Sequence, residues 1–291
     1  MAVYKRHYEP FHGRLTQRWS RCFVLTRFAF RDLFASRFFL GFFIACLLPV
    51  LGFAGYIFVA NSSLVHMLLS LASAKLKLHV STGFFTAFLQ VQSSFAFLMT
   101  CWVCPTLVAG DLSNGALPLF LSRPFSRAEY VAGKFAVLGV LLSFLTWIPA
   151  LALLFLEAGL SSAPWLGSHR WMIGPILWTS LVWIVLLSLV ALATSAWVKW
   201  RIVAMGAIFA VFLIPSGFGA VIDATLQTHW GRLLDLAYLF HVILYAGFRT
   251  SYTGTEATIP HSAAWGMFAL VSVLSLELLQ ARLRAFEVVR G

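Results

Sequence analysis

Long apolar runs separated by short polar segments dominate the chain. Six of these runs are long enough to cross the roughly 30 Å of bilayer hydrocarbon, which requires about 20 residues in a helix. The runs are continuous and do not alternate with a period of two residues, a pattern that favours membrane helices over a β-barrel. The six spans are expected at residues 38–60, 83–108, 135–156, 171–197, 202–222 and 262–281.

Composition agrees with this pattern. Apolar residues make up 60% of the 291 positions and charged residues only 11%, whereas a soluble domain carries about 25% charged residues. A globular core of this length does not bury so much apolar surface, because part of any globule stays in contact with water. The expected fold class is therefore an all-α membrane protein with six transmembrane helices.

The basic residues predict a topology. With the N-terminus in the cytoplasm, 16 of the 21 Lys and Arg residues fall on the cytoplasmic side, and the exceptions are Lys75, Lys77, Arg170, Arg232 and Arg249. Cytoplasmic loops of membrane proteins are enriched in Lys and Arg. We therefore expect a multi-pass protein of the bacterial inner membrane with both termini in the cytoplasm. Because the formal charge of +11 follows this topology, we expect lipids and no nucleic acid as its partners.

The first span and the cysteines carry no sign of export or of a disulfide framework. The first apolar run starts only at Phe38 and has no clear small-residue cleavage site, so we expect it to stay as a membrane anchor. Cys22 precedes this run, and Cys46 lies within it. Cys101 and Cys104 form a C-x-x-C spacing inside the second span, where we interpret them as small buried hydrophobic residues and not as a metal or redox pair.

Residues 15–34 have one apolar and one charged face when drawn as a helix. The apolar face carries Leu15, Trp19, Cys22, Phe23, Phe30, Leu33 and Phe34, and the opposite face carries Arg14, Arg18, Arg21, Arg31 and Asp32. Val24, Leu25 and Phe28 are exceptions to this division. This pattern predicts an amphipathic helix in the headgroup plane, with arginines on anionic lipid phosphates. The alternative is an ordinary basic flank that only sets the topology.

The segment 223–261 is the longest connection on the outer side, and its part 231–248 is semi-apolar. A seventh span there would move Arg282, Arg284 and Arg290 to the outer side, against the charge rule. We therefore expect an outer-leaflet or re-entrant helical element. The whole chain reads as one domain over 1–291, with an N-terminal segment 1–37, a membrane core 38–281 and a cytoplasmic tail 282–291.

Residues 111–134, DLSNGALPLFLSRPFSRAEYVAGK, connect the second and third spans. Asn114 and Gly115 belong to a turn signal. Pro124 interrupts the apolar run that follows, because the residue before a proline avoids the helical region. Ser126 and Glu129 have the spacing of a capping box, which starts a new helix. The segment predicts a short helix, a hinge and a second helix start, all facing the cytoplasm.

This stretch resembles the ABC-2 family of ABC-transporter permeases, in which a turn, LPLFLSRP and SR-EY--GK recur between the second and third membrane helices. The sequence RDLFASRFF before the first span looks like the corresponding segment of that family, and the single-domain permeases of the nitrous-oxide-reductase maturation type look most similar. The resemblance implies a cytoplasmic coupling helix between the second and third spans. It also implies a homodimer of permeases, each docked through this segment onto a separate ATPase subunit that binds ATP and Mg.

The resemblance gives the segment its candidate contact residues for the ATPase. An apolar knob comes from Asn114, Gly115, Leu117, Phe120 and Leu121, charge contacts come from Arg123 and Arg127, and Glu129 caps the next helix or pairs with the partner. The alternative is a capped loop whose arginines only set the topology. The chain has no G-x-x-x-x-G-K-[ST] loop, since Lys134 is followed by Phe135. We therefore expect no catalytic residue, cofactor or metal in this chain.

Polar and small residues inside the spans are the candidates for a translocation path. Gln90, Gln92, Ser93 and Ser94 form either a polar wall of such a path or hydrogen bonds between helices. In the fifth span, Gly206 and Ala210 permit close helix approach along the path or at a dimer interface. The run that contains Pro215, Ser216, Gly217 and Gly219 is expected to break the fifth helix near its outer end.

Two further groups of residues have open roles. Glu277 in the last span is either a coupling switch or a side chain that reaches the interface or pairs with Arg282 or Arg284. Six histidines lie on or near the outer side without a metal-ligand spacing: His66, His79, His169, His229, His241 and His261. The leading hypothesis is the permease subunit of an ABC exporter. The alternatives are an ion-coupled secondary carrier or channel, a membrane-embedded enzyme, and a membrane component that transmits ATPase work without moving a solute.

Overall fold

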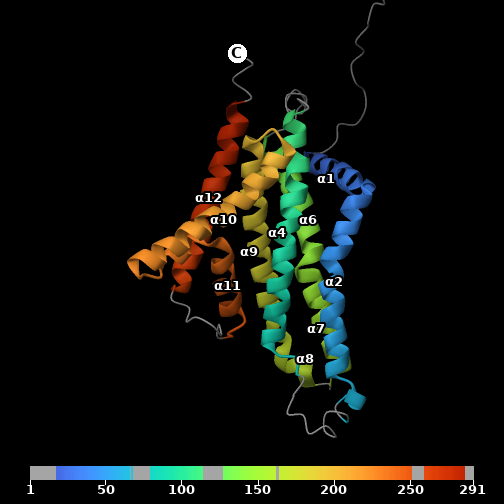
Figure 1. Cartoon of the computed structure of the whole chain (residues 1–291). Helices are drawn as coiled ribbons and strands as arrows, with labels where there is room; N and C mark the ends of the chain where they lie inside the picture. The colour runs from blue at the N-terminus through green and yellow to red at the C-terminus, as the bar shows by residue number, and fades with distance from the viewer. Residues whose placement is uncertain are drawn as a thin grey trace, which may run out of the picture.

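The computed structural model of the chain describes residues 18–65, 67, 79–113, 127–161, 164–250 and 259–285. These residues form helices joined by short turns, and they contain no β-strand. Six helical stretches are long and apolar enough to cross a membrane, in agreement with the expected fold class. They are α2 (Arg37–Ala60), α4 (Thr82–Ser113), α6 (Arg127–Leu145) with α7 (Trp147–Leu160), α9 (Ile173–Trp197), α10 (Arg201–Leu226) and α12 (His261–Ala285) (Figure 1).

Shorter helices complete the fold. They are α1 (Arg18–Ala35), α8 (Pro164–His169), the 3₁₀ turns η1 (Arg170–Met172) and η2 (Trp230–Leu234), and α11 (Leu236–Gly247). The central helix is α9, which packs against α4, α6, α7, α10, α11 and α12. By contrast, α2 lies at the edge of the bundle and leaves Phe38 85% and Leu51 70% exposed. Such an apolar outer face is compatible with lipid as its solvent.

Helix α1 crosses one end of the bundle at a large angle to α2 (Figure 1). The chain turns at Ser36, whose hydroxyl accepts a hydrogen bond from the backbone N–H of Phe39 at 3.4 Å and so caps α2. The hydroxyl of Thr26 donates to the carbonyl of Gly133 on α6 at 3.4 Å. Leu33 is buried, while Arg31 is exposed. The described part of α1 is therefore helical and packs on the bundle, and its position in the headgroup plane stays a prediction.

The third span differs from its expected form. Residues 135–156 were expected as one helix, but α6 ends at Leu145 and α7 begins at Trp147. Pro149 explains the break, because a proline ring collides with the carbonyl four residues earlier, here that of Leu145. The hydroxyl of Thr146 donates to the carbonyl of Leu142 at 2.8 Å and satisfies a polar group at the break. The two helices together cover the span Ala128–Leu160.

The expected break in the fifth span is wrong. Helix α10 continues from Arg201 through Pro215 to Leu226. Gly219 of this run serves close packing instead, because a Cβ atom on it would overlap the carbonyl oxygen of Gly231 in η2. Ser216 is used as well, since its hydroxyl donates to Asp235 at 2.8 Å. Neighbouring elements can thus keep a proline-containing membrane helix intact.

The outer segment folds back onto the bundle. Helix α10 leans away from the other helices, η2 returns along it, and α11 lies beside α9 (Figure 1). The ring of Phe240 lies 4.4 Å from that of Trp183, and a Cβ on Gly247 would lie 3.3 Å from Thr179. These contacts make α11 antiparallel to α9 and bring its first residue level with the middle of α9. With 12 residues, α11 is too short to span a bilayer.

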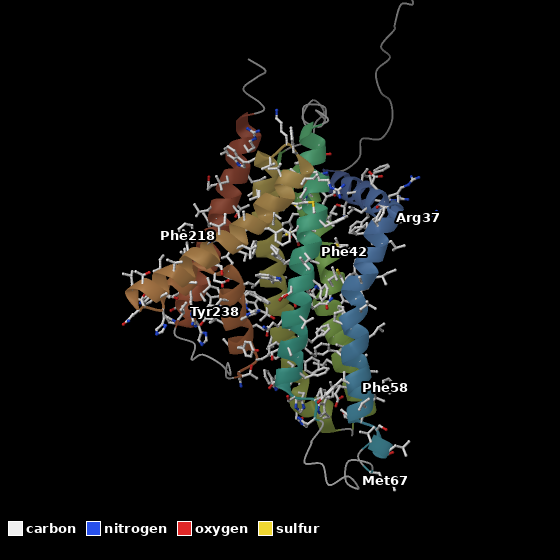
Figure 2. The ribbon with its side chains drawn as sticks, viewed as in Figure 1. Arg37, Phe42, Phe58, Met67, Phe218 and Tyr238 are labelled. Carbon is white, nitrogen blue, oxygen red and sulfur yellow. The ribbon has the colours of Figure 1, made fainter. Side chains whose placement is uncertain are left out.

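One end of the bundle collects the elements that the topology assigns to the cytoplasm. The C-terminal end of α4, the start of α6, the start of α10 and the C-terminal end of α12 lie at the end that α1 crosses (Figure 1). Residues Arg37 and Met67 mark the two ends of α2 and the short stretch after it (Figure 2). Consecutive candidate spans therefore start at alternate ends of the bundle, as six membrane crossings require. The assignment of the α1 end to the cytoplasm stays a prediction.

Candidate functional site

The expected contact residues for an ATPase fall mostly outside the described residues. This holds for Asn114, Gly115, Leu117, Phe120, Leu121 and Arg123, and for the side chain of Arg127. Glu129 lies in the first turn of α6 and is partly buried. The described parts are the two ends of segment 111–134, where α4 stops and α6 starts.

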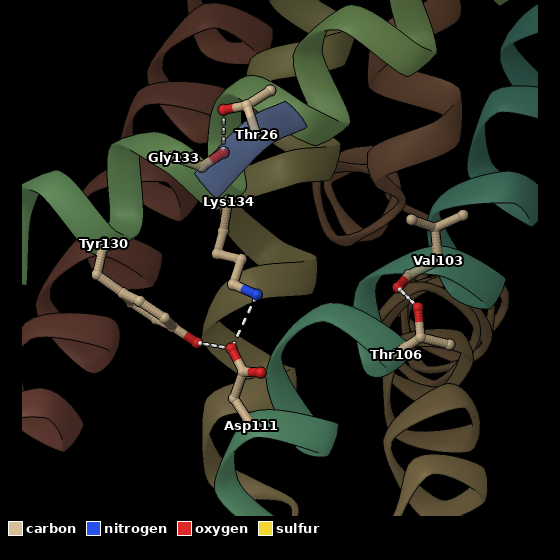
Figure 3. A network of polar contacts seen from close by, with 7 residues as sticks. All are labelled: Thr26, Val103, Thr106, Asp111, Tyr130, Gly133 and Lys134. Atoms are coloured by element: carbon tan, nitrogen blue, oxygen red, sulfur yellow. Dashed lines mark hydrogen bonds and ion pairs between the residues drawn. The ribbon is translucent and has the colours of Figure 1, made fainter. Parts of the chain in front are cut away.

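A polar network joins these two ends. The ammonium group of Lys134 lies 2.8 Å from Oδ2 of Asp111, and the hydroxyl of Tyr130 donates to the same oxygen at 2.9 Å (Figure 3). Tyr130 and Lys134 are one helical turn apart, so both side chains reach one carboxylate. The side chains of Lys134 and Asp111 are 7% and 22% exposed. The network is therefore largely shielded from water and holds α4 to α6.

Helix α1 meets the network from the other side of α6. Thr26 of α1 bonds to the carbonyl of Gly133, the residue directly before Lys134 (Figure 3). Sequence reasoning missed this junction, because it used Lys134 only to reject a phosphate loop and placed Asp111 in a connection. The sequence did contain one signal, because the acidic Asp111 follows one apolar span and the basic Lys134 precedes the next. A charge near hydrocarbon costs free energy unless it is paired.

The polar residues of α4 point to different neighbours. Nε2 of Gln92 donates to the carbonyl of Cys46 on α2 at 2.9 Å. The hydroxyl of Tyr245 on α11 donates to Oε1 of Gln90 at 3.3 Å. Nε1 of Trp183 on α9 donates to the carbonyl of Ser93 at 3.2 Å. Both glutamines therefore form hydrogen bonds between helices, one of the two roles that the sequence left open for them.

Ser93 and Ser94 also line a groove between α4, α9, α10 and α11, which we call the outer groove. Its volume is about 230 Å³. Its polar side chains are Ser93, Ser94, Ser216, Asp235 and His241, and its aromatic side chains are Phe97, Trp183, Phe212 and Phe240. Sequence reasoning assigned only the two α4 serines to a translocation path and named Ser216 and His241 for other reasons, because no local pattern reveals how the helices that carry them pack together.

Among the described residues, no other element approaches Gly206 closely. Gly206 is exposed, and a Cβ atom there would meet no atom within 4 Å. Ala210 is partly buried. The close glycine contact of α10 is instead that of Gly219 with Gly231. An interface with a second copy through Gly206 stays a prediction.

Three further polar positions lie outside the junction and the outer groove. Glu157 is buried at the outer end of α7, where Nδ2 of Asn61 donates to its carboxylate at 2.8 Å. The sequence reading ended its span one residue earlier and so overlooked this acid.

Glu277 is exposed on α12, whereas Nε of Arg282 donates to the carbonyl of Ala196 at 3.2 Å. Within the described ranges, no group of three or more His, Cys, Asp or Glu side chains is arranged to hold a metal ion.

The fold defines the chain as an α-helical membrane protein with six candidate spans. No protein-family model matches the chain. No curated protein sequence matches it either. A narrower assignment therefore depends on the motif in residues 111–134 and on the arrangement of the helices around it.

Proposed function

We propose that the chain is the permease subunit of an ABC exporter, driven by a separate ATPase subunit that docks on residues 111–134. The observation that carries this proposal is the junction at the ends of that segment. Asp111 lies near the end of α4 and Lys134 near the start of α6, on either side of the motif, and these two side chains form an ion pair. A partner that moves the segment would therefore move α4 and α6 together.

The packing supports a path from this junction to the outer groove. Helix α4 contacts α6, α9 and α10, and its residues Ser93 and Ser94 line the groove. Closure of two ATPase subunits on ATP would shift the population between two arrangements of these helices. The default assembly is a symmetric pair of permeases with a pair of ATPases. ATP and Mg bind in the partner subunits.

One observation favours an ion-coupled carrier as the second candidate. Such a carrier needs titratable groups within the membrane, and the buried Glu157 lies inside the candidate span Ala128–Leu160. Uptake or efflux in vesicles that follows an ion gradient without ATP would favour the carrier. Transport that needs ATP and the partner subunit would favour the exporter.

The direct test is purification of the tagged full-length chain from its native membranes in mild detergent. We expect a subunit with a Walker A motif to co-purify, together with ATP hydrolysis that the chain alone does not show. Replacing Phe120 and Leu121 with Asp should remove both, because charged side chains do not fit an apolar groove of a partner. The matched control is Leu64→Asp, which is 71% exposed at the opposite end of the bundle and should retain both. Absence of such an ATPase from the wild type, or its retention by the Phe120 and Leu121 variant, would contradict the proposal.

A further inference from the structure

The outer groove holds a carboxylate at an unusual depth. Asp235 immediately precedes α11, and the packing of Phe240 on Trp183 places it level with the middle of α9. A carboxylate so far from the ends of a membrane bundle is costly unless hydrogen bonds, water or a cation stabilise it. The groups around this carboxylate therefore indicate which kind of ligand the groove binds.

Hydrogen bonds fix the direction of this carboxylate. Oδ1 accepts the backbone N–H groups of Ala237 and Tyr238, both at 3.0 Å. Oδ2 accepts the hydroxyl of Ser216 at 2.8 Å. Asp235 is thus the N-cap of α11 and also the carboxylate of the groove wall.

No basic side chain of the described segments forms an ion pair with Asp235. The ion pairs found in these segments join Lys134 to Asp111 and Arg232 to Asp223. The positive end of α11 offsets part of the charge. His241 also lines the groove, but burial lowers the pKa of its imidazole more than Asp235 raises it. A neutral imidazole adds no counter-charge, so a full counter-charge within the groove would have to come from a bound molecule.

Four aromatic side chains, Phe97, Trp183, Phe212 and Phe240, contribute to the remaining lining. The ring centroids of Phe97 and Phe212 are 4.8 Å apart, and those of Trp183 and Phe240 are 4.4 Å apart. A further contact of 6.2 Å between Trp183 and Phe212 connects the two pairs. The bond from Nε1 of Trp183 to the carbonyl of Ser93 holds the indole in place. Aromatic faces around a carboxylate form the environment that recognises alkylammonium ions.

From this arrangement we infer that the outer groove binds a monovalent organic cation, an alkylammonium ion attached to an apolar chain. Its volume of about 230 Å³ is below the roughly 300 Å³ at which drug-sized pockets begin. The groove therefore fits a compact cationic head, while the apolar chain follows the outer face of α10, where Leu213 is 64% exposed. A zwitterionic lipid headgroup fits less well, since its phosphate would lie near Asp235 without a basic partner. The claim that such cations are the substrates of the transporter rests on the proposed function. The claim that the groove binds them does not.

Binding can be measured without an ATPase. The purified chain in dodecyl maltoside is dialysed to equilibrium against radiolabelled hexyltrimethylammonium, with hexylphosphocholine and hexanol as competitors of equal chain length. We expect saturable binding that both competitors displace at least about tenfold less well than the unlabelled cation. Equal displacement by hexanol would show an apolar site only, and equal displacement by hexylphosphocholine would assign the groove to lipid headgroups. Either result would overturn the inference.

Two variants separate the carboxylate from the fold. Asp235→Asn keeps an oxygen that caps α11, because Asn is as good an N-cap as Asp, and it should weaken cation binding about tenfold. The matched control Asp223→Asn keeps the acceptor for the N–H of Gly231 and lies outside the groove lining, so binding should stay within about twofold. Unchanged binding by the first variant, or an equal loss in both, would refute the role of Asp235.

If Asp235→Asn lowers the thermal midpoint of unfolding, an aromatic substitution tests cation binding by the groove without changing the N-cap of α11. Phe97→Leu removes one ring of the groove and should weaken cation binding severalfold. Phe144→Leu, at a side chain 50% exposed on α6, is its control and should change nothing. Equal affinity in Phe97→Leu would count against the aromatic walls. Cation binding without a co-purifying ATPase would refute the proposed function alone, and a co-purifying ATPase without cation binding would refute this inference alone.

Discussion

Lys134→Met tests whether the two ends of segment 111–134 are held together by charge. Methionine keeps most of the apolar length of the lysine stem but removes its ammonium group. The carboxylate of Asp111 then faces the hydroxyl of Tyr130 without the cation that lies 2.8 Å away in the wild type. Because Lys134 is only 7% exposed, water does not easily replace that cation.

The size of the effect follows from the burial of the pair. Removing one partner of a buried ion pair costs about 3–5 kcal/mol of unfolding free energy, since an unpaired charge stays behind. Asp111 is 22% exposed and regains some hydration, which lowers the expected cost to about 2–3 kcal/mol. In Asp111→Asn with Lys134→Met the charge is gone and the amide oxygen still accepts from Tyr130, so the cost should fall to about 1 kcal/mol.

The assay is reversible unfolding in mixed micelles, with the four members of the double-mutant cycle measured under one condition. Lys199→Met is the matched control, because Lys199 is exposed at the same end of the bundle and its loss should change stability by less than about 0.5 kcal/mol. A loss in Lys134→Met no larger than in Lys199→Met would refute the argument. The argument would also be refuted if the loss of unfolding free energy in the double variant equalled the sum of the losses in the two single variants, because the effects of mutating two interacting residues do not add.

The remaining predictions concern α10 and the topology. Gly219→Ala should lower the unfolding free energy by about 1–3 kcal/mol, since the new methyl group overlaps the backbone of Gly231. The control Gly206→Ala meets open space and should leave the thermal midpoint of unfolding unchanged or slightly higher. Equal midpoints in the two variants would contradict the contact of Gly219 with Gly231. In a variant without native cysteines, Leu64→Cys should react with a membrane-impermeant maleimide in intact cells, and Lys199→Cys only after permeabilisation. The reverse pattern would place segment 111–134 outside the cell and contradict the docking of an ATPase there.

The spans themselves were predictable, because a membrane helix satisfies its backbone hydrogen bonds within its own sequence. The start of α2 at Arg37 and the end of α9 at Trp197 lie within one residue of the expected limits. Two deviations arose at prolines within the spans. The break before Trp147 follows from Pro149 and was readable in principle. The continuity of α10 through Pro215 was not, because η2 supports that helix from a different part of the chain.

The junction and the groove were decided by packing between helices. Asp111 and Lys134 were assigned to a connection, because a hydropathy pattern counts each charge alone and does not show that two charges neutralise each other. Gln92 turns to α2, while Ser94 on the same helix lines the outer groove. That difference depends on the rotation of α4 against its neighbours. Sequence alone determined which segments enter the membrane, since this depends on transfer of each segment into lipid. Only the tertiary structure decided which polar groups meet, because partners from separate helices have no spacing along the chain.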